Sequence, residues 1–279
     1  MMQENPPRDA GPYAAYSDLT VSHNGPIATV AMAPSGDAQY ARHNWDVPQY
    51  YPKHRQIGQC IAQLRLNSKV RVIVLTGVGE HFFVPPSASP GGGKGHTPRG
   101  DWELSQAVSN TILTMIECEK PIIARVNGDA IGFGSSLVFA CDFIVAVDDA
   151  LVGDHHLGMG DLPYGRSDLG VVPGDGGVVV VPPNMPPAMA REYLMLAQGW
   201  SAKELAARGI INRAVPSDEL DGAVDEYAQR IIARPMHAVG WTKRALNREL
   251  VARYAMTFDV AWAYELAGFH VSDPAVEQE

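Results

Sequence analysis

Residues 121–142, PIIARVNGDAIGFGSSLVFACD, constrain the fold of this chain more strongly than any other segment. The first residues are mostly apolar and β-branched, which predicts a buried strand, and Pro121 stands at its start, where a missing N–H group is tolerated. Gly128, Gly132 and Gly134 then allow the chain to turn sharply and to approach another group closely. Small and apolar residues follow, so the segment predicts a strand, a glycine-rich turn and a helix.

The start of such a helix has a chemical use. Its free N–H groups form a binding site for anions, and an enzyme can direct them at a negatively charged oxygen that develops during a reaction. The same pattern also occurs in ordinary connections between a strand and a helix, where the glycines serve packing. Spacing alone leaves both interpretations open.

Apolar patterning elsewhere predicts an α/β fold. Residues 70–77, VRVIVLTG, are typical of a continuous buried strand, and residues 18–33 alternate around an Asn-Gly turn as a hairpin does. Residues 51–67 place apolar side chains at helical spacing, and a second helix is predicted from Asp101, its expected N-cap. Residues 142–154 predict two short strands. This alternation of strands and helices favours a largely parallel sheet.

Composition excludes several classes of protein. Lys and Arg number 22 against 31 Asp and Glu, a formal charge of −9, which argues against sequence-independent binding of nucleic acid. The residues are 46% apolar, but no run approaches the length of a membrane span, so no membrane association is expected. Cys60, Cys118 and Cys141 lie in apolar contexts without CxxC spacing, which favours reduced core residues and a cytoplasmic location.

Three regions are expected along the chain. Residues 1–15 are rich in proline and polar residues and predict a flexible N-terminal arm. Residues 16–200 contain the α/β core, and residues 201–279 are predicted to be a C-terminal helical region. The glycine- and proline-rich residues 77–100 predict a long loop, and they lack the GxxxxGK[ST] spacing of a phosphate-binding loop.

The strand, turn and helix segment resembles the signature of the crotonase superfamily of enoyl-CoA hydratases and isomerases, roughly A-x-V-N-G-x-A-x-G-G-G-x-x-L-x-x-A-C-D. Supporting stretches are VIVLTGVG at 72–79, VVPGDGG at 171–177 and SAKELAARGIINRAV at 201–215. The resemblance extends from about Leu19 to about Ala267. The matching residues of the signature are Ala124, Val126, Asn127, Gly128, Ala130, Gly132, Gly134, Leu137, Ala140, Cys141 and Asp142.

This resemblance implies a crotonase-like spiral of β-β-α units, followed by C-terminal helices that support a homotrimer or a dimer of trimers. It also implies that two backbone N–H groups hold the enolate oxygen of the substrate. One of these groups aligns with Phe133. The other falls at Pro86 or, with a one-residue slip, at Ser87, and a proline has no N–H to donate.

The chain departs from the hydratases at both of their catalytic glutamates. The resemblance places Ser136 and Arg166 at these two positions, where we expect them to contact the substrate. Water addition to an enoyl thioester normally needs two carboxylates, one to activate water and one to deliver a proton. Simple enoyl-CoA hydration by that mechanism is therefore not expected.

A different set of acids and bases resembles the β-diketone hydrolases of the superfamily, such as 6-oxocamphor hydrolase. Asp175 in VVPGDGG, His54, and Glu265 in AYELAG align with polar residues of that site. The water-activating histidine aligns with His155 or His156, and an insertion of about nine residues after them leaves the choice open. A histidine oriented by Asp175 would activate water, His54 would donate to a carbonyl oxygen, and Glu265 would position substrate or water.

Each of these residues also has an ordinary structural interpretation. His54 lies at the helical spacing of apolar residues, as a core histidine does, and Glu265 on a helix is usually a surface residue. Asp175 between glycines is typical of a turn. The adjacent His155 and His156 resemble half of a metal site, but no HExxH pattern or third ligand at suitable spacing accompanies them, so no metal is expected.

The expected partner is a small molecule, without a cofactor, and a CoA moiety on the substrate is left open. Trp45 and Tyr51 precede the first helix, where they either line an apolar ligand pocket or simply pack. The first hypothesis is therefore hydrolysis of a carbon–carbon bond in a bulky or cyclic β-diketone. The alternatives are an enoyl-CoA hydratase or isomerase with a relocated acid–base set, and an inactive binding protein of the same fold.

Overall fold

The computed structural model describes residues 12–33, 52–85, 98–158, 170–268 and 271. Its strands form two sheets, one of six strands in the order β1-β2-β3-β4-β6-β9 and one of three strands in the order β5-β7-β8. The strands are β1 (Leu19–Asn24), β2 (Ile27–Met32), β3 (Val72–Gly77), β4 (Ile122–Val126), β5 (Ala130–Ile131), β6 (Phe143–Val147), β7 (Leu151–Gly153), β8 (Gly199–Ser201) and β9 (Arg213–Val215).

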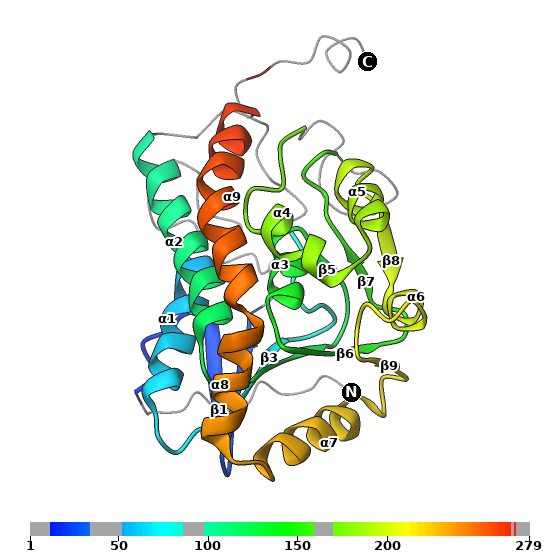
Figure 1. The fold of residues 1–279 in the computed structure, drawn as a ribbon. Helices are drawn as coiled ribbons and strands as arrows, with labels where there is room; N and C mark the ends of the chain where they lie inside the picture. Colours follow the sequence, from blue (N-terminus) through cyan, green and yellow to red (C-terminus); the bar gives the residue numbers. More distant parts are fainter. Residues whose placement is uncertain (1–11, 34–51, 86–97, 159–169, 269–270, 272–279) are drawn as a thin grey trace.

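Helices surround these sheets. In Figure 1, α1, α2 and α9 lie together on one side of the molecule, and α5 and α6 lie on the other. The helices are α1 (Pro52–Leu66), α2 (Pro98–Glu117), α3 (Phe133–Phe139), α4 (Gly177–Val180), α5 (Pro187–Met195), α6 (Ala202–Ala207), α7 (Leu220–Ile232), α8 (Met236–Leu246) and α9 (Arg248–Gly268), with a short 3-10 helix η1 (Pro182–Asn184). The predicted α/β class is confirmed.

The six-stranded sheet is mostly parallel. The first two strands form the predicted antiparallel hairpin, and the turn between them holds Gly25 at φ +55°. The other pairs in this sheet are parallel, with Ile27 opposite Val72 and Ile73 opposite Ile122. Every residue of β3 is buried, which confirms the prediction from its continuous apolar run.

The glycine-rich segment has one more element than the sequence predicts. β4 precedes the turn and α3 follows it, but β5 stands between them. This strand pairs in parallel with β7, so that Ile131 lies opposite Gly153. Two residues are too few to carry a periodic signal, which is why the pattern did not indicate a strand. The pairing brings the turn beside residues 154–156.

Two long helices cover one part of the core. α1 packs against α2, and its buried side chains include Ile57, Ile61 and Leu64. α2 begins at Pro98, so Asp101 lies within its first turn and the predicted N-cap is wrong. Proline suits the first turn of a helix because the N–H group that it lacks has no partner there.

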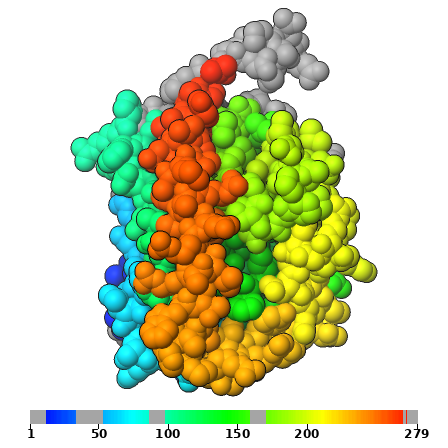
Figure 2. All heavy atoms as spheres, viewed as in Figure 1, coloured from blue at the N-terminus to red at the C-terminus, as the bar shows by residue number. Residues whose placement is uncertain are grey.

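The C-terminal region contributes both a strand and helices to the core. β9 pairs with β6 in the main sheet, and α9 packs against α2 and α4. Figure 2 shows α9 as a ridge on the surface between α2 and the part of the chain that carries α4 and α5. Glu265, the polar residue among the buried residues of α9, therefore faces the segment before α4.

Two expectations from composition concern this fold. The three cysteines, Cys60, Cys118 and Cys141, are buried and free, as the core prediction requires. Within the described parts of the chain, none of the helices combines the length and the apolar character needed to span a membrane.

Candidate active site

The turn between β5 and α3 requires glycine for two separate reasons. Gly132 has φ +61°, a left-handed conformation that other residues rarely adopt. A Cβ atom on Gly132 would also lie 2.5 Å from Cε1 and Nδ1 of His155. The backbone N–H of Gly132 donates to the carbonyl of Gly153, and Phe133 then begins α3. The glycine predicted to allow close approach therefore lies against a histidine.

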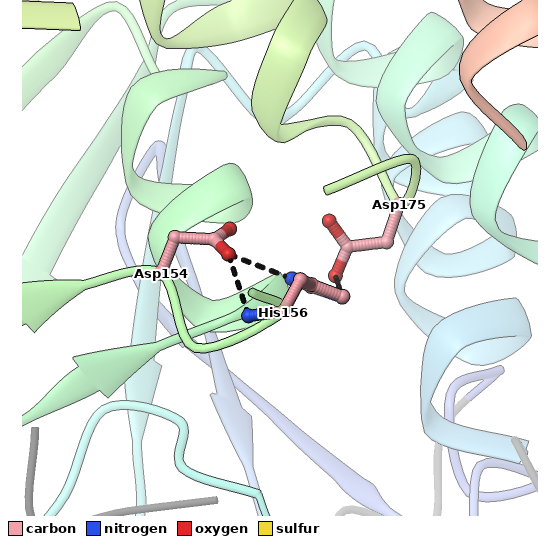
Figure 3. Close-up of side chains that lie close together, drawn as sticks. All are labelled: Asp154, His156 and Asp175. Atoms are coloured by element: carbon pink, nitrogen blue, oxygen red, sulfur yellow. Dashed lines mark hydrogen bonds and ion pairs between the residues drawn. The ribbon is translucent and has the colours of Figure 1, made fainter. Parts of the chain in front are cut away.

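Asp154, His156 and Asp175 form a buried cluster (Figure 3). His156 Nδ1 lies 2.8 Å from Asp154 Oδ1, which also accepts a hydrogen bond from the backbone N–H of His156. At the other ring nitrogen, His156 Nε2 lies 3.4 Å from Asp175 Oδ2. The imidazole has a carboxylate at each nitrogen, so its orientation is fixed from both sides.

Side chains from two further elements contact this cluster, one at Asp175 and one at His156. Ser136 on α3 donates a hydrogen bond to Asp175 Oδ1 across 3.1 Å. Glu265 on α9 brings another carboxylate, with its Oε1 3.8 Å from His156 Nε2. A Cβ atom on Gly174 would lie 2.6 Å from Glu265 Oε2, so this glycine leaves the room that the carboxylate occupies. The site therefore joins α3, the segment before α4, and α9.

Burial and mutual charge shift the pKa values of this cluster. Burial raises the pKa of Asp175 to about 6 and that of Glu265 to about 8, although the charge of His156 opposes both shifts. Burial alone would lower the pKa of His156, but Asp154 and Asp175 outweigh it and raise that pKa well above its usual value. Near neutral pH, His156 is therefore a charged imidazolium and Glu265 retains its proton.

Two further histidines lie close to Phe133 and the turn before it, and both are held neutral. His54, near the start of α1, stacks on the ring of Phe133 with the centroids 4.3 Å apart. Burial, and then the charge of Lys53, lowers the pKa of His54 to about 3. Burial, and then the charge of His156, lowers the pKa of His155 to about 4.

The sequence-predicted site residues that the structure describes come together. Of the two adjacent histidines, His156 is the one that lies beside Asp175. Because His156 is charged near neutral pH, it has no free nitrogen that could accept a proton from water, which is the role that the alignment gives to one of these histidines. Ser136, expected to contact the substrate, is fully buried and hydrogen-bonded to Asp175. The expected site residues that lie outside the described parts of the chain are Trp45, Tyr51, Pro86, Ser87 and Arg166.

Sequence reasoning missed Asp154. The signal for it was present as a spacing, because an aspartate commonly accepts a hydrogen bond from the backbone N–H two residues further on. Asp154 does so with His156, and the same oxygen also meets the imidazole. An aspartate at this spacing before a candidate catalytic histidine therefore predicts a residue that orients the ring.

The donor atoms of Asp154, His156 and Asp175 lie within 4.8 Å of one another, which is close enough to suggest a metal site. However, the two carboxylates face different nitrogens of the same imidazole. A histidine binds a metal ion through one nitrogen, whereas here each nitrogen of the imidazole already has a carboxylate partner. The contacts present are those of a cluster held by one hydrogen bond and one ion pair of the imidazole.

Comparison with known proteins places the chain in a family. The sequence pattern of the enoyl-CoA hydratase/isomerase family matches residues 54–263. The chain belongs to this family. Among curated relatives, the carnitinyl-CoA dehydratase of Salmonella agona is 31% identical over 215 residues, which cover 77% of this chain and 74% of the relative. The expected membership of the crotonase superfamily is thereby confirmed.

Solved structures of the superfamily share the fold. An enoyl-CoA hydratase/isomerase from Mycobacterium paratuberculosis superposes with a TM-score of 0.74 at 23% identity, over 92% of this chain and 95% of the other. A β-diketone hydrolase from the cyanobacterium Anabaena, bound to (S)-3-oxocyclohexyl acetic acid, gives a TM-score of 0.75 at 18% identity, over 93% and 97%. At these identities the likeness concerns the fold, and the chemistry must be argued from the site.

Proposed function

We propose that this member of the enoyl-CoA hydratase/isomerase family hydrolyses a carbon–carbon bond in a bulky or cyclic β-diketone. The observation that carries the proposal is the buried contact of His156 Nε2 with Asp175 Oδ2 at 3.4 Å. Ser136 stands where the resemblance expects a hydratase glutamate, and it donates to Asp175. The acid–base groups of this site therefore lie at different positions from those that the hydratases use.

The first step needs a base that takes a proton from water. Asp175, with its pKa raised to about 6, is largely ionised near neutral pH, and the imidazolium of His156 stabilises that charge. The carboxylate accepts one proton of the water, and the oxygen adds to one carbonyl carbon of the diketone. A base with a pKa close to the working pH suits this task.

The second step breaks the carbon–carbon bond. The tetrahedral intermediate collapses to a carboxylic acid, and the bonding electrons leave as the enolate of the second carbonyl. In this proposal the N–H of Phe133 holds the enolate oxygen, as the resemblance implies. Glu265, whose pKa is raised to about 8, still carries a proton near neutral pH and delivers it to the enolate carbon. One water is consumed and no redox change occurs.

A second candidate function is addition of water to an enoyl-CoA thioester, or the reverse dehydration. Asp175 and Glu265 favour it, because their pKa values are raised to about 6 and about 8, which gives one base and one acid at neutral pH. The curated relatives named carnitinyl-CoA dehydratase also favour it. Both candidates pass through an enolate, and they differ in whether a carbon–carbon bond breaks.

Parallel assays on a cyclic β-diketone and on crotonyl-CoA separate these candidates. We expect ring opening of the diketone in H₂¹⁸O, with one labelled oxygen in the new carboxylate, and no loss of the enoyl absorbance. Asp175→Asn should lower kcat for the diketone by about 10²- to 10⁴-fold, whereas Asp225→Asn, an exposed control on α7, should leave it unchanged. Turnover of crotonyl-CoA alone would favour the second candidate, and inertness toward a broad panel of both classes would favour a binding protein.

A further inference from the structure

His155 lies against the glycine-rich turn but has no part in the Asp154–His156–Asp175 cluster. It directly follows the aspartate of that cluster in the sequence, and its ring centroid is 5.0 Å from that of His156. A Cβ atom on Gly132 would lie 2.5 Å from Nδ1 and Cε1 of His155 and 3.8 Å from its Nε2. The imidazole therefore occupies the space directly beside Gly132, the residue that precedes Phe133 in the turn.

Packing alone does not explain why a histidine stands at position 155, because its Nδ1 atom lacks a partner. His155 Nδ1 is buried, and the described residues offer it no hydrogen-bond partner. A buried polar atom without a partner lowers stability, and an aliphatic side chain of similar size at this place would avoid that loss. Such groups in a folded protein call for another reason, and catalysis is a common one.

The charge of the ring points to the kind of role. Burial, and then the charge of His156, lowers the pKa of His155 to about 4, so the imidazole is neutral at physiological pH. A neutral imidazole carries one N–H and donates a hydrogen bond without bringing a positive charge. With Nδ1 enclosed against the turn, the free donor is the N–H at Nε2.

We propose that His155 donates a hydrogen bond from Nε2–H to the substrate carbonyl oxygen that becomes negative as the enolate forms. His155 would be the second hydrogen-bond donor to this oxygen, and the N–H of Phe133 would be the first. The resemblance assigns the second donor to the backbone of a loop residue that aligns with Pro86 or Ser87. Proline has no N–H, so the sequence itself motivates a replacement. The inference rests on the enolate chemistry of the proposed function and holds equally for diketone hydrolysis and for hydration.

The other two histidines described near the turn and the buried cluster, His156 and His54, fit this role less well. His156 has a carboxylate at each ring nitrogen, so both of its donors are already engaged. His54 stacks on the ring of Phe133 rather than on the backbone of the turn. His155 is the histidine whose ring lies over the backbone of Gly132.

Two substitutions separate a donor from a packing residue. His155→Leu removes the N–H, whereas His155→Gln retains an N–H donor at the corresponding position. His237→Leu, at an exposed histidine of α8, is the control. We expect His155→Leu to lower kcat by about 10²- to 10³-fold with little change in KM and no fall in Tm, and His155→Gln to retain activity within about tenfold of the wild type.

A binding measurement makes the test independent of turnover. The probe is 2-acetylcyclohexane-1,3-dione, a stable enolate at neutral pH, and its binding is measured by calorimetry. We expect the wild type and His155→Gln to bind it, and His155→Leu to bind it at least tenfold more weakly. In ¹⁵N NMR spectra of the free protein, His155 should be the neutral tautomer with its proton on Nε2.

The outcomes distinguish this inference from the proposed function. His155-dependent binding of the enolate without turnover of either substrate class would reject the proposed function and support the role of His155. The role is overturned if His155→Leu binds the enolate as well as the wild type does, if the wild type does not bind it, or if the proton lies on Nδ1. A parallel loss of Tm and activity in both variants would assign His155 to packing.

Discussion

Ser136 Oγ donates a hydrogen bond to Asp175 Oδ1 across 3.1 Å, and both side chains are buried. The bond connects α3, which begins at the glycine-rich turn, to the loop that carries the candidate base. It favours the ionised form of Asp175 and so opposes the effect of burial on its pKa. Ser136 thus stands at the position where a hydratase is expected to have a catalytic glutamate. Here the carboxylate belongs to Asp175 on another loop, and Ser136 donates a hydrogen bond to it.

Removing this hydrogen bond should shift the pH dependence of the enzyme. In Ser136→Ala the pKa of Asp175 rises further, so less of the base is ionised near neutral pH, and the acidic limb of the pH profile of kcat/KM moves to higher pH. The rate below neutral pH should fall by about fivefold, the equivalent of about 1 kcal/mol for one hydrogen bond. Ser105→Ala on α2 is the control, and an unshifted acidic limb in Ser136→Ala would show that Asp175 is not the titrating base.

Glu265 should make the stability of the protein depend on pH in a defined direction. Its pKa is raised from 4.5 to about 8 in the folded state, so the folded protein holds this proton more tightly than the unfolded chain. The stability that this proton contributes is complete below about pH 4.5 and is lost as the pH rises through about 8. Glu265→Gln does not titrate and should therefore gain in Tm relative to the wild type across this range.

The measurement compares the melting temperatures of Glu265→Gln and the wild type at pH 5 and pH 8.5. We expect this difference in Tm to be larger at pH 8.5 than at pH 5. Each ~1 kcal/mol that ionisation of the buried Glu265 costs the wild type corresponds to about 2–4 °C, the proportion usual for proteins of this size. Glu249→Gln, at an exposed position of α9, should show no such trend. A Tm difference that shrinks with rising pH would mean that Glu265 is ionised in the folded protein at low pH.

Gly174 should be required for the position of Glu265. A Cβ atom there would lie 2.6 Å from Glu265 Oε2 and 2.7 Å from the carbonyl oxygen of Ala261. Gly174→Ala should therefore displace the carboxylate and reduce kcat by about 10²-fold, the usual contribution of a general acid. Gly222→Ala on α7 meets nothing within 4 Å and is the control. Full activity in Gly174→Ala would show that the present position of Glu265 is not needed for catalysis.

The parts of the fold that depend on local signals could be predicted from the sequence. The apolar run of β3, the Asn-Gly hairpin and the glycine-rich turn each carry their cause within a few residues, and each is confirmed. β5 could not be predicted because it exists through its pairing with β7, a contact between distant residues. The same pairing also places residues 154–156 beside the glycine-rich turn.

The site was predictable as a set of residue types but not as an arrangement. Alignment indicated His155 or His156 as the partner of Asp175, and the insertion after them removed the register needed to choose. In the fold, His155 packs on Gly132 and His156 lies beside Asp175. Ser136 was expected to contact the substrate because it aligns with a hydratase glutamate. A sequence cannot show that its hydroxyl has a buried acceptor on another loop.

Asp142, the last residue of the signature, should be a structural residue and not a catalytic one. Its Oδ2 lies 2.6 Å from Lys243 Nζ, and it also accepts a hydrogen bond from the backbone N–H of Ile122 at 2.7 Å. Lys243 is buried and donates in addition to the carbonyl of Met115 at 3.1 Å, so α8 is fastened to the end of α2 and the start of β4.

Breaking this buried pair should cost far more stability than breaking a surface pair. Lys243→Met leaves the carboxylate of Asp142 buried without its counter-charge, and we expect a loss of about 3–5 kcal/mol in the free energy of unfolding. The double variant Asp142→Asn with Lys243→Met should lose less than the sum of the single variants, because no unpaired charge remains. Glu226→Gln, which weakens the exposed contact with Arg213, should leave the stability nearly unchanged. Urea denaturation measures the wild type, both single variants, the double variant and the Glu226→Gln control. Strict additivity in the double variant would show that Asp142 and Lys243 stabilise the fold independently of each other.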